Sequence, residues 1–75
     1  MEAVKIQSSQ IQEVAYDAEI SKLYVKFVRS GWYSYKGVPV ELYVGLTQAP
    51  SADKYFAQYI KAKFAYQKHL EKQPW

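Results

Sequence analysis

The chemically most suggestive residues are aromatic and basic side chains that alternate between positions 24 and 36. Exposed rings beside cations are how proteins hold single-stranded nucleic acid, because bases stack on the rings while lysine or arginine contacts the phosphates. The candidate binding residues are Tyr24, Lys26, Arg29, Trp32 and Lys36. Aromatic residues are also frequent in strands, and alternating lysines keep a sheet face soluble, so a purely structural role stays open.

Residues that carry catalytic chemistry are present, but their spacing predicts no active site. His69 is the only histidine in the sequence. Ser8 and Ser9 are expected to shape the start of the first strand, and Tyr33 and Tyr35 are expected to point into the core. The sequence has no metal-ligand spacing, no nucleophile–base arrangement and no phosphate-binding glycine loop. We therefore expect a non-enzymatic protein without a metal or other cofactor.

A β-hairpin is the element that must position the candidate binding residues. Residues 23–28 alternate between apolar and mixed side chains, as a half-buried strand does. Arg29-Ser30-Gly31 is typical of a three-residue hairpin loop whose glycine takes the left-handed conformation. The predicted pairs are Val28 with Trp32, Phe27 with Tyr33, Lys26 with Ser34, Val25 with Tyr35, and Tyr24 with Lys36. This register gives the ribbon one apolar face and one aromatic, basic face.

The second half of the chain has helical spacing. Pro39 ends the third strand and suits a first helical turn, and the apolar residues after it predict a short helix of about two turns. Beyond the break at Pro50, Ser51 is a suitable N-cap for a long helix that is expected to run to about Lys72. We therefore predict an α+β domain: a three-stranded antiparallel meander, beginning near residues 11–16, followed by a short helix and a long C-terminal helix on one face.

Two stripes on the predicted long helix are further candidates. One is an interface for a protein partner or a second copy of the chain, formed by Tyr55, Tyr59 and Tyr66. The other is a secondary basic stripe, formed by Lys54, Lys61 and Lys68. Packing at the edge of the core also explains the tyrosines, and a solvated helix face also explains the lysines.

Length, composition and charge limit the classes of protein to which this chain can belong. A chain of 75 residues has room for one domain, whose core we place at about residues 8–66 with tails at 1–7 and 73–75. The absence of cysteine excludes disulfides and thiolate metal sites. The formal charge of +3 permits contact with nucleic acid without requiring it. No apolar run approaches the ~20 residues of a membrane span, so we expect a cytoplasmic protein without membrane contact.

An ordered set of residues gives the chain a family resemblance. The set comprises Ser8-Ser9, Ile11, Val14, Tyr16-Asp17, Leu23, Val25, Phe27, Gly31, Tyr33-Ser34-Tyr35, Val38-Pro39, Ala49, Ser51, Tyr55-Phe56 and Ile60. With this pattern, residues 8–64 resemble the KTSC domain, which is named for its occurrence at the C-terminus of some lysyl-tRNA synthetases and also occurs as a stand-alone bacterial or phage protein. The resemblance implies the fold class given above, and RNA binding has been suggested for the family. Asp53 stands where the family pattern has glycine.

Three functions follow from these observations. We expect a binding module that holds single-stranded RNA through the aromatic, basic sheet face, with affinity that falls as salt rises. One alternative is a small regulator that binds a protein partner or self-associates through the tyrosine stripe. The other is a domain that sequesters a small nucleotide between the same rings and cations.

Overall fold

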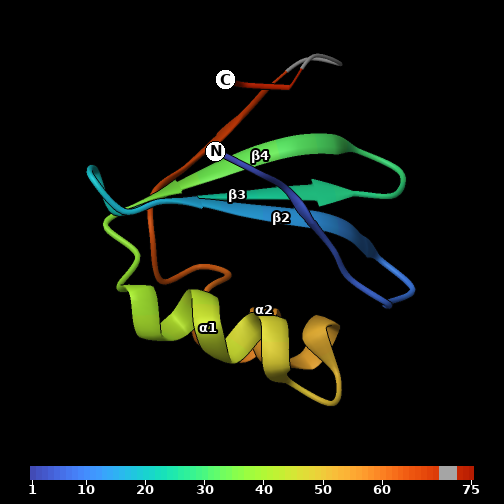
Figure 1. The fold of residues 1–75 in the computed structure, drawn as a ribbon. Coiled ribbons are helices and arrows are strands. Elements are labelled where there is room, and N and C mark those ends of the chain that lie inside the picture. Colours follow the sequence, from blue (N-terminus) through green and yellow to red (C-terminus); the bar gives the residue numbers. More distant parts are fainter. Residues whose placement is uncertain (70–72) are drawn as a thin grey trace.

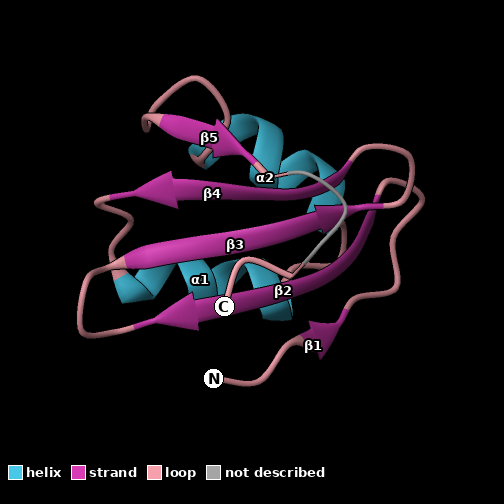
Figure 2. Ribbon diagram, turned by 90° about the horizontal axis from the view of Figure 1, so that it is seen from above, coloured by secondary structure: helices cyan, strands magenta, loops and turns pink. Residues whose placement is uncertain are grey.

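The computed structural model describes residues 1–69 and 73–75, and it shows a sheet covered on one face by two helices (Figure 1). The strands are β1 (Val4–Lys5), β2 (Ile11–Asp17), β3 (Lys22–Phe27), β4 (Gly31–Lys36) and β5 (Tyr66–Lys68). The helices are α1 (Val40–Gln48) and α2 (Ala52–Tyr59). Neighbouring strands are antiparallel and follow the order β1-β2-β3-β4-β5 across the sheet (Figure 2). The α+β class is therefore confirmed.

The predicted three-stranded meander forms the centre of a larger sheet. β2, β3 and β4 are its three long strands, and two short strands extend it, β1 beside β2 and β5 beside β4. The predicted number of three strands is wrong. β1 has only two residues and carries little periodic signal, and β5 lies in a segment that was expected to be helical.

The hairpin of β3 and β4 has the predicted faces but a different register. The observed pairs are Lys22 with Lys36, Leu23 with Tyr35, Tyr24 with Ser34, Val25 with Tyr33, Lys26 with Trp32, and Phe27 with Gly31. Gly31 has the expected left-handed conformation (φ 80°), but it pairs directly with Phe27. Val28 therefore belongs to the loop, where its amide donates to the Gln10 carbonyl at 2.8 Å. The predicted register is wrong by two residues, an even number, so every side chain keeps its face.

α2 begins as predicted and ends much earlier. The Ser51 side chain accepts a hydrogen bond from the Lys54 amide at 3.4 Å, which confirms the N-cap. The helix ends at Tyr59, because the amides of both Ile60 and Lys61 then bond to the Phe56 carbonyl.

The chain turns back after α2 and returns to the sheet. Ala62 adopts a positive φ of 66°, a conformation that no helix continues through. Residues 66–68 then pair with β4, whose edge would otherwise be open. The predicted long helix to Lys72 is wrong as far as the structure describes the chain, and residues 70–72 of that prediction lie outside the described residues.

The sheet carries a hydrophobic core on each face. The larger core lies between the sheet and the helices and contains Ile11, Val14, Leu23, Val25, Tyr35, Val38, Leu46, Ala52, Phe56 and Ile60. The smaller core lies on the other face and contains Ala15, Tyr24 and Trp32, with Ala3 and Trp75 packed against it. Both ends of the chain lie on this second face (Figure 1). Neither α1 nor α2 is long and apolar enough to cross a bilayer.

Candidate functional site

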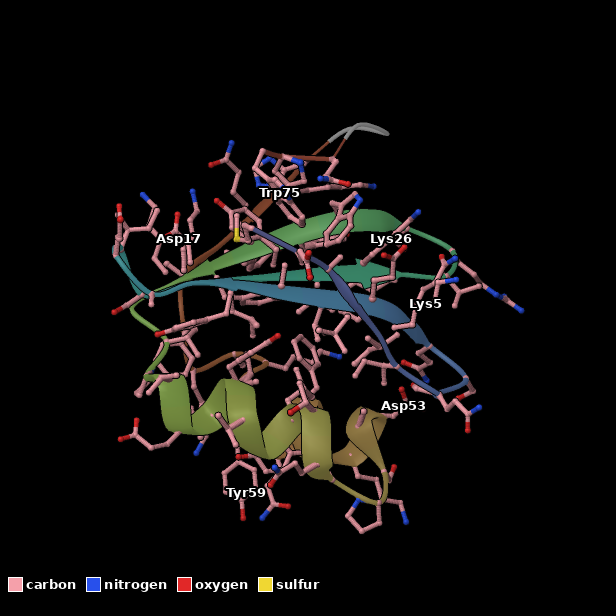
Figure 3. The ribbon with its side chains drawn as sticks, in the orientation of Figure 1. Lys5, Asp17, Lys26, Asp53, Tyr59 and Trp75 are labelled. Carbon is pink, nitrogen blue, oxygen red and sulfur yellow. The ribbon has the colours of Figure 1, made fainter. Side chains whose placement is uncertain are left out.

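The sheet face opposite the helices carries the aromatic residues that the sequence suggests for stacking. Lys26 lies opposite Trp32, and Tyr24 lies two residues away on the same face. However, Tyr24 is only 6% exposed and Trp32 only 3%. The Trp75 ring lies over them, with its centroid 5.0 Å from each of the two rings (Figure 3). The expectation that these rings face solvent is therefore wrong, and the cover is Trp75 rather than a helix.

The basic residues proposed for the same face do not gather into one patch. The Lys26 ammonium lies 3.8 Å from a Glu13 carboxylate oxygen. Arg29 is exposed in the β3–β4 loop, and Lys36 is exposed at the other end of β4. Lys22, which the sequence analysis did not single out, places its ammonium 5.6 Å from the Tyr24 ring centroid. This face is therefore a second core with cations at its margins.

The two stripes expected on the long helix are dispersed, because that helix is short. Among the lysines, Lys54 lies on α2, Lys61 follows the helix, and Lys68 lies on β5. Among the tyrosines, Tyr55 and Tyr59 pack together on α2 with ring centroids 4.7 Å apart, while Tyr66 lies on β5. Tyr59 points away from the sheet, on the outer side of the helices (Figure 3).

His69 directly follows β5, the edge strand beside β4. Its amide donates to the Trp32 carbonyl at 2.9 Å, which continues the pairing of β5 with β4. Its Nε2 lies 2.8 Å from the hydroxyl oxygen of Ser34, a fully buried residue that needs a polar partner. His69 was expected near the end of a helix, and the structure places it at the end of a strand.

A groove between α2 and the helix-facing side of β3, β4 and β5 brings together residues that are distant in the sequence. It has a volume of about 420 Å³. Its aromatic walls are Phe27, Tyr33, Tyr35, Phe56 and Tyr66, and its other lining residues are Gln10, Ile11, Ser30, Asp53, Ala57, Lys61 and Ala62. We call this feature the aromatic groove. Its size suits one or two planar rings.

A second hollow extends the aromatic groove toward the β3–β4 loop. It measures about 440 Å³ and shares Gln10, Phe27 and Ser30 with the groove. Arg29 lines this extension, so an exposed cation lies toward one end of the hollow and Lys61 lies on the groove wall. Sequence reasoning assigned most of the groove rings to the core. The only sequence signal for the groove is the density of tyrosines in strands, which does not separate packing from binding.

Comparison with known proteins decides the family. Residues 7–64 match the model of the KTSC domain. The chain belongs to the KTSC domain family. The crystal structure of a KTSC domain protein from Yersinia pestis is 31% identical and superposes with a TM-score of 0.88, covering 91% of this chain and 96% of that one. The resemblance seen in the sequence is thus confirmed.

Two further relatives are similar to this KTSC domain in sequence. An uncharacterized protein from Stutzerimonas stutzeri is 36% identical over 61 residues, which cover 81% of this chain and 86% of that protein. A lysine–tRNA ligase from Trichormus variabilis is 34% identical over 64 residues, which cover 85% of this chain but only 11% of the ligase. The similarity to the ligase is therefore confined to a small part of that enzyme.

Asp53 links the β1–β2 loop to α2 through two hydrogen bonds. One carboxylate oxygen accepts a hydrogen bond from the Ser8 hydroxyl, and the other accepts one from the Ser9 hydroxyl at 2.8 Å. Ser8 in turn accepts hydrogen bonds from the amides of Gln10 and Ile11, at 3.3 and 3.2 Å. This loop forms one rim of the aromatic groove, so the Asp53 contacts hold that rim in place.

The Asp53 contacts make a pH dependence of stability testable. The Ser8 hydrogen bond, more than any other contact, lowers the pKa of Asp53 below its ordinary value of 3.8. A carboxyl whose pKa is lowered by folding stabilises the protein at pH values above its ordinary pKa. This contribution to stability is lost as the pH falls through the lowered pKa. We expect Asp53→Asn to have a lower melting temperature than the wild type at about pH 7. Between about pH 5 and about pH 2.5, where carboxyls titrate, its melting temperature should fall less than that of the wild type. Circular dichroism melts would measure this difference. Glu2→Gln, at an exposed carboxylate, is the control, and parallel profiles for Asp53→Asn and the wild type would refute the role of Asp53.

Proposed function

We propose that this KTSC domain is a non-enzymatic module that binds single-stranded RNA in the aromatic groove. The observation that carries the proposal is an open groove lined by five aromatic rings and by Lys61. Tyr66 is exposed and Phe27 and Tyr33 are half-buried, so these three rings are the ones that can stack on a base, whereas Tyr35 and Phe56 are buried at the base of the groove. Bases of a single strand stack on such rings, and each stacked base contributes about 1–3 kcal/mol to binding. Two stacked bases would therefore give a measurable affinity.

The location of the proposed site differs from the one expected from the sequence. Tyr24 and Trp32 are covered by Trp75, so they offer no free ring face to a ligand. Arg29 is a candidate at both the expected and the proposed site, because it lies in the loop between β3 and β4 and lines the extension of the groove. The formal net charge of +3 supports an anionic ligand in either case.

The dimensions of the groove support a single strand rather than a duplex. A volume of about 420 Å³ is of the size that holds a small ligand or a few rings. A single strand can turn its bases out onto protein rings, whereas the bases of a duplex are already stacked and paired. A free nucleotide is a smaller ligand of the same chemistry.

The experiment compares two lysines on opposite faces of the sheet. Lys61 lines the groove, whereas Lys36 alternates with Tyr35 along β4 and so points to the other face. Each change to alanine removes one positive charge. We expect Lys61→Ala to weaken binding of a short single-stranded RNA at low salt several-fold and to reduce the salt slope by about 1, because one phosphate contact is lost.

The matched control for this experiment is Lys36→Ala, which is expected to bind nearly as the wild type does. Fluorescence anisotropy of an internally labelled RNA octamer would measure all three proteins. Failure of the wild type to bind the octamer at low salt would end the proposal. Weaker binding by Lys36→Ala alone would move the site to the face that carries Trp75.

A further inference from the structure

Three tyrosines from two adjacent strands form a cluster at the sheet side of the aromatic groove. Tyr33 and Tyr35 lie on the same face of β4, and Tyr66 on β5 pairs with Tyr35. The Tyr66 ring centroid is 5.8 Å from that of Tyr33 and 6.0 Å from that of Tyr35. All three residues line the groove. We call them the tyrosine cluster.

The hydroxyl of Tyr35 has hydrogen-bonding capacity that the described residues do not use. Tyr35 is only 5% exposed, and the side-chain hydrogen bonds of the described residues do not involve its hydroxyl. Within the same residues, no side-chain nitrogen or oxygen that is sealed from solvent lacks a partner. The Tyr35 hydroxyl must therefore keep some contact with solvent, and the groove is the opening that Tyr35 lines.

The tyrosine cluster offers uncharged hydroxyl donors with two cations nearby. Burial raises the pKa of Tyr35 to about 12, and the neighbouring Tyr33 and Tyr66 hydroxyls add to the increase. The Tyr35 hydroxyl is therefore uncharged at neutral pH and available as a donor. Two cations lie nearby: Lys61 lines the same groove, and the Lys68 ammonium is 5.9 Å from the Tyr33 ring centroid.

One carboxylate shares the groove with the cluster. Asp53 lies on α2, where both of its oxygens accept hydrogen bonds from Ser8 and Ser9. Its charge is thereby partly offset by local donors, and Lys61 adds a positive charge to the same lining. A ligand with several acceptor oxygens fits this set of donors better than a neutral ring alone does.

We infer that the tyrosine cluster and Lys61 form a binding site for the terminal phosphate of a single-stranded nucleic acid. A phosphomonoester has three strong acceptor oxygens, for which the tyrosines of the cluster offer hydroxyl donors, and a charge of about −1.5 to −2 that Lys61 and Lys68 complement. An internal phosphodiester has only two free oxygens and one charge, so it uses the cluster less fully. This inference rests on the proposed function, since the rest of the strand is held by the same groove.

Three RNA octamers of one sequence test the inference. They carry a 5′-phosphate, a 3′-phosphate or hydroxyls at both ends, and titration calorimetry measures their binding without a label. We expect one of the two phosphorylated octamers to bind the wild type about tenfold more tightly than the hydroxyl-ended octamer. The reason is that hydrogen bonds to a charged group are stronger than those between neutral groups. Tyr35→Phe and Tyr66→Phe keep their rings and lose one hydroxyl each. In each variant, we expect most of the preference to be lost, where the preference is the ratio of that variant's affinities for the phosphorylated and the hydroxyl-ended octamer.

The control is Tyr59→Phe, which removes a hydroxyl from the outer side of α2 and should keep the preference. Circular dichroism melts of each variant verify folding. Equal binding of all three octamers by the wild type, or a preference that survives in both Tyr35→Phe and Tyr66→Phe, would overturn the phosphate site and leave the proposed function standing. Absence of binding by all three octamers would overturn both.

Discussion

Replacing Trp32 with alanine is expected to lower the free energy of unfolding by about 3–5 kcal/mol, the usual cost of truncating a buried tryptophan. Trp32 is 3% exposed and packs with Ala15 and Tyr24 in the smaller core, beneath Trp75. A domain of this length is stable by roughly 4–11 kcal/mol, so the loss is a large fraction of the total. The effect is one of folding rather than of ligand binding, because the ring offers no free face.

Urea denaturation followed by circular dichroism would measure this loss. The two tryptophans also make fluorescence informative, since Trp32→Ala leaves Trp75 as the only tryptophan and Trp75→Ala leaves Trp32. Trp75 is only partly buried, so Trp75→Ala should cost less and should shift the emission of Trp32 to longer wavelength. A cost below about 1 kcal/mol for Trp32→Ala, the range of a surface substitution, would contradict the burial of this ring.

The second large effect is expected at Phe56. This residue of α2 is 5% exposed, and its ring packs edge-on against Phe27 and Tyr35, with centroids 5.4 and 5.3 Å away. It thereby joins the helix to the sheet and forms one wall of the aromatic groove. Phe56→Ala should cost about 3–5 kcal/mol, because it removes these contacts and leaves a cavity.

A matched variant on the same helix separates this packing effect from any loss of helix propensity. Tyr59 is 41% exposed, so Tyr59→Ala removes an aromatic ring from α2 with a much smaller loss of buried area. We expect Tyr59→Ala to retain most of the stability, and Phe56→Leu, which keeps much of the volume, to fall between the two alanine variants. Equal costs for Phe56→Ala and Tyr59→Ala in urea denaturation would show that the contacts with Phe27 and Tyr35 do not support the fold.

The faces of the hairpin could be predicted from the sequence because a strand repeats every two residues. Alternation places Val25 and Tyr35 on one side and Tyr24 and Trp32 on the other, and a register error of two residues leaves this unchanged. The exact register could not be predicted, because Val28 does not pair with Trp32 across the hairpin and instead bonds through its amide to the Gln10 carbonyl, in a different loop.

The end of α2 could not be predicted for a related reason. Phe56, Ile60 and Phe64 have helical spacing, and all three do contact the larger core. The turn at Ala62 and the pairing of β5 with β4 are decided by tertiary contacts at the edge of the sheet, which override local helical preference. A glycine or proline, the usual signal for such a turn, is absent from residues 60–65.

The candidate site was the least predictable feature. Its lining comes from the β1–β2 loop, the hairpin, α2 and β5, so it exists only once the whole chain has folded. Its rings have the same spacing as core residues. Trp75, which covers the surface that sequence reasoning favoured, lies outside the residues that define the family.

Both ends of the chain emerge on the side of the sheet that carries Trp75, whereas the aromatic groove opens on the side of the helices (Figure 1). A tether or a fused protein joined at either end would therefore leave the groove accessible. Attachment at the N-terminal end is preferable for surface immobilisation, because it leaves the packing of Trp75 on Tyr24 and Trp32 undisturbed.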